Sequence, residues 1–140
     1  MTDLTKGLEY MTEALAIYAD YPDAHMNRGC TYSVHGNNYL AIGNKAAADA
    51  DHAAAKKDYE AYIAIKQDNP SVYNWLGLEF AYIGDWDGAI RNYSQAITIN
   101  PDANKGEYYY NRAVAKRSKG DASAAADAGV AKQKGWPAAF

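Results

Sequence analysis

Residues 70–103 place small and aromatic side chains at the spacing of two amphipathic helices. The stripe of the first helix comprises Tyr73, Leu76, Gly77 and Phe80, and that of the second comprises Ala89, Tyr93 and Ala96. On a helix that turns roughly 100° per residue, each set falls on one face. Gly84-Asp85 lies between the stripes and supplies a helix stop followed by a helix start. The pattern predicts an antiparallel helical hairpin whose backbones approach closely at the small residues.

This segment resembles the tetratricopeptide repeat, in which an aromatic residue, a Leu-Gly pair and a second aromatic precede alanine, an aromatic, alanine and proline over about 34 residues. Every signature place holds the expected type, with Tyr73 for the usual tryptophan and Tyr93 for phenylalanine. The resemblance implies an all-α fold, a right-handed superhelix (α-solenoid) of antiparallel hairpins with about seven helices. It also implies a concave face, lined by the first helix of each pair, where peptides or protein segments bind.

A degenerate copy of the repeat spans residues 106–140. Tyr109, Ala113 and Pro137 keep their places. Arg112, however, stands where leucine is expected, and Gly129 stands where the aromatic residue of the second helix belongs. We therefore expect a last repeat whose apolar core is depleted.

A lengthened copy spans residues 22–69, with Gly29 in place and Arg28 where leucine is expected. Its second helix arrives 14 residues later than that of the clear repeat. Because 14 residues are close to four helical turns, the insertion preserves facial phase. We expect two longer helices, over about 23–42 and 45–67, with Asn44 capping the second; a flexible loop is the alternative.

Residues 1–21 are predicted to hold an orphan second helix over residues 3–19. Gly7, Met11 and Ala14 occupy its small-large-small places. The chain is therefore predicted to be a single domain without strands. Its parts are the N-terminal half-repeat 1–21, the lengthened repeat 22–69, the clear repeat 70–105 and the degenerate repeat 106–140.

Residues opposite the core stripe of each first helix are expected to line a peptide-binding groove. Trp75 lies about 200° from Tyr73, so the hairpin core does not require it, and it is a candidate anchor for a partner. Packing on the adjacent repeat is the alternative. The expected groove comprises Met26, Asn27, Cys30, Asn74, Trp75, Leu78, Tyr82, Tyr110, Asn111, Val114 and Arg117. Its apolar centre favours a partner held by apolar anchors and amide hydrogen bonds rather than by charge.

One subgroup of the family binds chaperone tails through a carboxylate clamp of lysine, asparagine and arginine residues. Asn27 and Asn111 resemble the asparagine of that clamp. Met26, Cys30 and Trp75 occupy places where cationic or amide groups would be needed. A terminal carboxylate would meet too little positive charge, so the chain is not expected to be a typical carboxylate-clamp domain.

Two further surfaces are candidates for contact. Tyr39, Leu40 and Ile42 make the tip of the long hairpin more apolar than an exposed turn should be, so we expect them to meet another part of the domain, a second copy or a partner. The final helix is expected over residues 122–134, with an apolar strip of Ala124, Ala125, Ala128 and Ala131. Either Trp136 and Phe140 fold back over this strip, or it is open to self-association.

No catalytic residue, metal site or cofactor is expected. The three histidines show no close ligand spacing, and Cys30 has no cysteine partner for a zinc site. A formal net charge of −3 disfavours nucleic acid as a partner. No apolar run approaches the roughly 18 residues of a membrane span. The lone cysteine and the absence of a secretory pattern after Met1 predict a cytoplasmic location.

The residues therefore predict a non-catalytic protein-interaction scaffold that binds a peptide or protein segment in its groove. The alternative is a structural self-assembly module that forms homo-oligomers through its uncapped ends or its long hairpin. The sequence names no particular protein or peptide partner.

Overall fold

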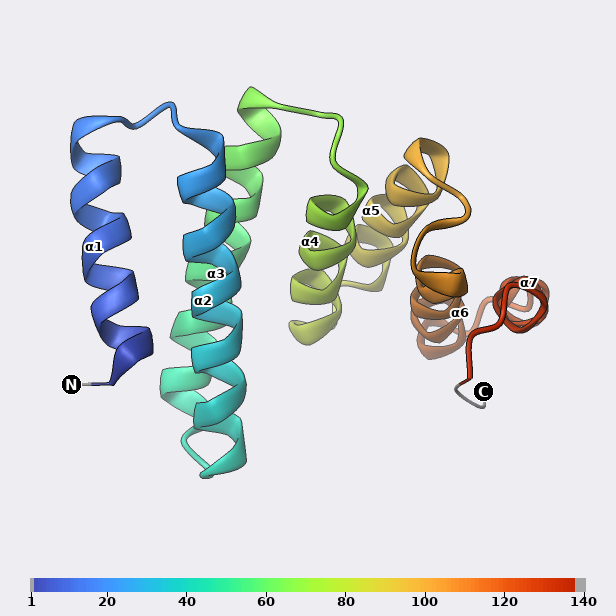
Figure 1. The fold of residues 1–140 in the computed structure, drawn as a ribbon. Helices are drawn as coiled ribbons and strands as arrows, with labels where there is room; N and C mark the ends of the chain where they lie inside the picture. Colours follow the sequence, from blue (N-terminus) through green and yellow to red (C-terminus); the bar gives the residue numbers. More distant parts are fainter. Residues whose placement is uncertain (1, 138–140) are drawn as a thin grey trace. The chain divides into compact units, whose positions relative to one another are not determined.

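The computed structural model describes residues 2–137, and within them the chain folds into seven α-helices and one short 3-10 helix, with no strand (Figure 1). The all-α class of helical hairpins is thus confirmed. The helices gather into two compact units that divide between Gln67 and Asp68. None of the described helices is long and apolar enough to cross a membrane.

The first unit contains three helices, α1 (Asp3–Ile17), α2 (Pro22–Ala41) and α3 (Lys45–Ile65). Helices α2 and α3 pack against each other along the long hairpin, and α1 packs against α2 (Figure 1). Helix α1 has a single buried side chain, Leu15. The remainder of its surface is half-buried or exposed.

The second unit contains α4 (Pro70–Tyr82), α5 (Trp86–Ile99), the 3-10 helix η1 (Ala103–Gly106), α6 (Glu107–Lys119) and α7 (Ala124–Gln133). Consecutive helices pack together, α4 on α5, α5 on α6 and α6 on α7. Helix α4 also contacts α6, so the first helices of two successive hairpins lie side by side.

The two clearest hairpins close through the same turn. Gly43 and Gly84 follow α2 and α4 with φ angles of 78° and 77°, a left-handed conformation that glycine adopts without strain. The next residue then caps the following helix: the Asn44 side chain accepts from the Ala47 amide at 3.1 Å, and the Asp85 side chain accepts from the Gly88 amide at 2.9 Å. Gly84 therefore ends α4 and Asp85 caps α5, as the sequence predicted.

A tyrosine ring on the second helix of the hairpin covers a glycine on the first. A methyl group placed on Gly77 would lie only 2.5 Å from the Tyr93 ring, and one on Gly29 would lie 2.7 Å from the Tyr59 ring. Both tyrosines are buried, with 1% of their surface exposed. The absence of a side chain at each glycine is what lets the two backbones approach closely enough for this contact.

The insertion in the first hairpin is helical, so the expected pair of longer helices is confirmed and the flexible loop is wrong. From Gly29 to the turn glycine there are 14 residues, against seven from Gly77 to its turn, so each helix gains seven residues, or two turns. The ring-over-glycine contact recurs after this step: the buried His52 ring lies over Gly36, 2.9 Å from a methyl group placed there. Phase is therefore kept along the whole hairpin.

Substituting the helical glycines separates packing from helix propensity. Gly77→Ala should lower the free energy of unfolding by about 1–2 kcal/mol. The new methyl group would overlap the buried Tyr93 ring, and the energy of this overlap exceeds what alanine gains in helix propensity. Gly129→Ala, in α7, should raise it by up to about 1 kcal/mol, because nothing lies within 4 Å of that position. Urea denaturation of both variants measures the difference, and shifts of the same sign would contradict the packing role of Gly77.

Candidate binding surface

The expected groove residues of the second unit come from two adjacent helices, α4 and α6. The Asn111 side-chain amide donates a hydrogen bond to the Asn74 side-chain oxygen at 2.9 Å, which joins the two helices directly. Asn74 is buried, with 2% of its surface exposed. Its side chain thus connects successive first helices, and Asn111 presents its half-buried amide at the same junction. The place of both asparagines in a peptide-binding groove remains a prediction.

One apolar side chain on each helix, one turn after the asparagine, is open to solvent. Leu78 of α4 and Val114 of α6 are 42% and 38% exposed. The remaining expected residues of this face are half-buried, Trp75, Tyr82 and Tyr110, or exposed, Arg117. The result is a surface, called here the α4–α6 face, with accessible aliphatic groups at its centre and a cation at its edge.

The C-terminal segment extends the α4–α6 face. The chain folds back after α7, and the Trp136 ring lies 5.7 Å from the Tyr110 ring of α6. The Lys134 ammonium lies 5.6 Å from the Tyr109 ring centre and pairs with Asp102. Trp136 thus lies beside Tyr110 of α6, its expected fold-back over the alanine strip of α7 remains a prediction, and Phe140 lies outside the described residues.

Helix α7 differs from its expected role. It begins at Ala124 rather than at residue 122, and the alanine strip does not form one open face. Ala124 and Ala131 are buried against the hairpin, Ala128 is half-buried, and only Ala125 is exposed. Ala124, Ala128 and Ala131 follow one another at spacings of four and three residues on the inward side of α7, whereas Ala125 is turned about 100° from Ala124 towards solvent.

The groove residues of the first unit all lie on α2. Met26 and Cys30 are half-buried, and Asn27 is exposed. The backbone carbonyl of Asn27 accepts a hydrogen bond from the Thr31 hydroxyl at 2.9 Å. Their membership of a groove shared with α4 and α6 remains a prediction.

The tip of the long hairpin is partly open. The Tyr39 ring packs on His35 with ring centres 4.6 Å apart. Leu40 and Ile42 are exposed, Ile42 to 77%. One of the three expected tip residues thus has a contact within its own helix, and the contact of the other two with a partner or second copy remains a prediction.

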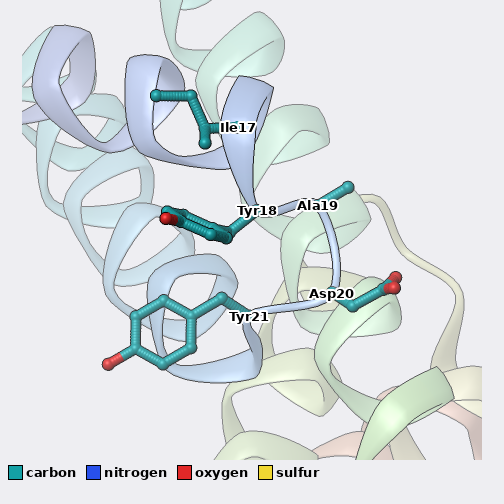
Figure 2. Close-up of a pocket in the computed structure, with 5 residues that line it drawn as sticks. All are labelled: Ile17, Tyr18, Ala19, Asp20 and Tyr21. Atoms are coloured by element: carbon teal, nitrogen blue, oxygen red, sulfur yellow. The ribbon is translucent and has the colours of Figure 1, made fainter.

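An apolar hollow that the sequence did not single out lies at the connection between α1 and α2. It encloses about 540 Å³ and is lined by Ile17, Tyr18, Ala19, Asp20 and Tyr21 (Figure 2). The Tyr18 and Tyr21 rings extend from the connection on one side, and the Asp20 carboxylate points away from them (Figure 2). In the sequence, the only indication of this hollow is the presence of Tyr18 and Tyr21 just after the end of α1.

Residues 70–103 match the family model of the tetratricopeptide repeat. This segment is a tetratricopeptide repeat. Among curated protein sequences, none matches the chain significantly.

Solved structures share the fold over nearly the whole chain. A structure described as MamA MSR-1 C2 has a TM-score of 0.76 and 17% sequence identity, and the match covers 94% of this chain and 67% of the other. Two further MamA structures have TM-scores of 0.56, with 19% and 18% identity; they cover 94% and 99% of this chain and 88% of their own. These likenesses establish a helical-repeat fold.

In the last hairpin, charged residues stand where the tetratricopeptide pattern has apolar ones. Arg112, at the leucine position, donates two hydrogen bonds to the buried Asp127 carboxylate of α7, both at 2.7 Å. Lys116, at the position of the second aromatic, lies 2.8 Å from the same carboxylate. An ion cluster therefore joins α6 to α7 at positions where the repeat pattern has apolar residues.

The lengthened repeat uses the same device at the same place. Arg28, again at the leucine position, binds Asp58 of α3 with distances of 2.8 and 2.7 Å. A further nitrogen of Arg28 donates to the Thr12 hydroxyl of α1, as Arg112 donates to the Ser94 hydroxyl of α5. Each arginine thus ties three successive helices together, and α1 takes the place in the first unit that α5 takes in the second.

Two histidines of α2 lie against aspartates of α3 in the first unit. His25 Nδ1 lies 3.2 Å from Asp58, and His35 Nδ1 lies 2.8 Å from Asp51. Within residues 2–137, no group of three or more histidine, cysteine or acidic side chains is arranged to hold a metal ion. The histidine–aspartate contacts join α2 to α3.

The Asp127 cluster makes stability depend on pH. Burial opposes ionisation of Asp127, but hydrogen bonds from Arg112 and Lys116 outweigh it and hold its pKa below the ordinary value of 3.8. The cluster is thus stabilising above about pH 3.8 and loses this effect as pH falls through the lower pKa of the folded state. Asp127→Asn should lower the free energy of unfolding by about 3 kcal/mol at neutral pH, because two cations lose their counter-ion.

The same substitution should matter less in acid, where the natural carboxyl is itself protonated. Urea denaturation at several pH values between neutrality and about pH 2 tests this. Glu60→Gln, which removes an exposed carboxylate paired with Lys56, is the control and should change stability by less than about 0.5 kcal/mol. A difference between Asp127→Asn and the natural chain that stays constant with pH would contradict the assignment.

Proposed function

We propose that this chain is a non-catalytic protein-interaction scaffold that binds a peptide or protein segment on the α4–α6 face. The observation that carries the proposal is the exposure of Leu78 and Val114 on neighbouring first helices that the Asn111–Asn74 hydrogen bond holds together. The tetratricopeptide repeat at residues 70–103 supports it, because helical repeats of this kind build extended binding surfaces.

The chemistry of the α4–α6 face favours a mainly apolar partner. Leu78 and Val114 provide accessible aliphatic surface, and Trp75 and Tyr82 provide half-buried aromatic rings beside it. Asn111 adds an amide suited to hydrogen bonding with a peptide backbone. Rigid helices hold these groups in place, so a partner would bind without first ordering the surface. The expected ligand is a segment with two or three apolar side chains spaced to meet α4 and α6.

Selection from a random peptide library tests the proposal. Peptides selected on the immobilised chain should bind the double variant Leu78→Ser, Val114→Ser at least about tenfold more weakly, because each exposed aliphatic group contributes roughly 1 kcal/mol when a ligand covers it. Fluorescence anisotropy of the labelled peptides measures the affinity. Both side chains are already exposed, so the variant should keep its fold.

Ile83→Ser is the matched control, because Ile83 is 60% exposed but lies in the turn after α4. It should leave peptide affinity unchanged. Trp75→Ala is a second test of the same face, and adding it to the double variant should weaken peptide binding further. Selected peptides that bind the double variant as tightly as the natural chain would exclude the α4–α6 face as the binding surface.

A further inference from the structure

Glycines inside the α-helices of the described chain fall into two groups. Gly29, Gly36, Gly77 and Gly88 each lie under an aromatic ring, with a ring atom 2.5–2.9 Å from where a methyl group would be. Gly7 in α1 and Gly129 in α7 have no such neighbour. A glycine inside a helix costs about 1 kcal/mol relative to alanine, and close approach by a ring is what offsets that cost elsewhere in this molecule.

Gly129 lies on the exposed side of α7, among side chains that leave the backbone accessible. Ala125 and Ala126 are exposed one turn before it, and Lys132 is exposed one turn after it. A methyl group at Gly129 would meet no atom within 4 Å. This surface, called here the α7 face, has room for a large side chain directly against the helix backbone.

The exposed tyrosine rings of the described chain all lie in the first unit. Tyr10 and Tyr18 are each 69% exposed and Tyr21 is 54% exposed, and all three belong to α1 or the connection that follows it. Tyr10 shares the outward side of α1 with Ile17, which is 73% exposed and lies two turns further along. This outward side, called here the α1 face, carries the kind of ring that covers glycines within the hairpins.

The two ends also carry opposite charge. Residues 2–23 contain five acidic residues and one lysine, a net charge of −4. Residues 102–137 contain seven basic and four acidic residues, a net charge of +3. Lys119 of this segment also pairs with Asp87 outside it. Glu9 and Glu13 flank Tyr10 on α1, and Lys132 lies beside Gly129 on α7; all three side chains are exposed. Opposite charges on the two surfaces favour their encounter.

We propose that the chain associates head to tail with copies of itself, the α1 face of one copy docking on the α7 face of the next. Tyr10 covers Gly129 of the neighbouring copy, as Tyr93 covers Gly77 within a hairpin, and Glu9 and Glu13 approach Lys132. Because the two surfaces differ, every open assembly keeps one unoccupied α1 face and one unoccupied α7 face. Association therefore extends into a chain or closes into a ring. This activity is separate from peptide binding on the α4–α6 face.

Sedimentation velocity of the full chain over about 1 μM to about 1 mM tests the proposal at the affinities expected of a small interface. The natural chain should sediment faster as its concentration rises. Tyr10→Lys and Gly129→Lys should each remove this dependence. Both positions are open to solvent and lysine favours helix, so circular dichroism should show both variants folded.

Mixing the two variants is the decisive arm. Tyr10→Lys keeps an intact α7 face and Gly129→Lys keeps an intact α1 face, so an equimolar mixture should form a 1:1 dimer that grows no further. Ile83→Lys, an equally exposed apolar-to-lysine change at the α4–α5 turn, should assemble like the natural chain. A natural chain that stays monomeric throughout, single variants that still assemble, or a mixture that stays monomeric would each overturn the proposal.

Discussion

The contact of an aromatic ring with a helical glycine governs how this chain packs. Tyr93 over Gly77 and Tyr59 over Gly29 bring paired helices together at a distance that no side chain on the glycine would permit. His52 over Gly36 repeats the contact two turns further along the long hairpin. A seven-residue addition to each helix is therefore accommodated without a change of face, because the added turns supply their own ring and glycine.

Where the leucine of the repeat is missing, an arginine bound to an aspartate of the next helix takes its place, with the ring present in the long hairpin and absent in the last one. The last hairpin has glycine instead of an aromatic residue at position 129, and Arg112 with Lys116 secures α7 through Asp127. A buried ion cluster of this kind adds less net stability than a well-packed apolar core, but removing one member leaves buried charges without a partner. The hairpin is thus specified by a few strong and directional contacts, which leaves the outward side of α7 lined with small residues.

The hairpin at residues 70–103 and the phase of the insertion could be predicted because both depend on periodicity within a single segment. The partners of Arg28 and Arg112 could not, since each aspartate lies on another helix and its register follows only from the packed hairpin. The alanine strip of α7 was assigned to one face because alanine fits a buried and an exposed position equally well. The exposure of Tyr10 and Tyr18 depends on how α1 packs against α2, which local sequence does not encode. For the same reason the burial of Asn74 and its hydrogen bond to Asn111 of another helix could not be predicted.

We infer that the side chains of the ring-over-glycine cores are structural and that a partner binds the first helices on the α4–α6 face. Amide chemical-shift mapping of the isotope-labelled chain with a selected peptide tests this most directly. The account predicts that the largest shifts fall on α4 and α6 around Leu78, Asn111 and Val114, with the core tyrosines unaffected. Shifts concentrated on the hairpin tip at Ile42 or on the α1–α2 connection would contradict it.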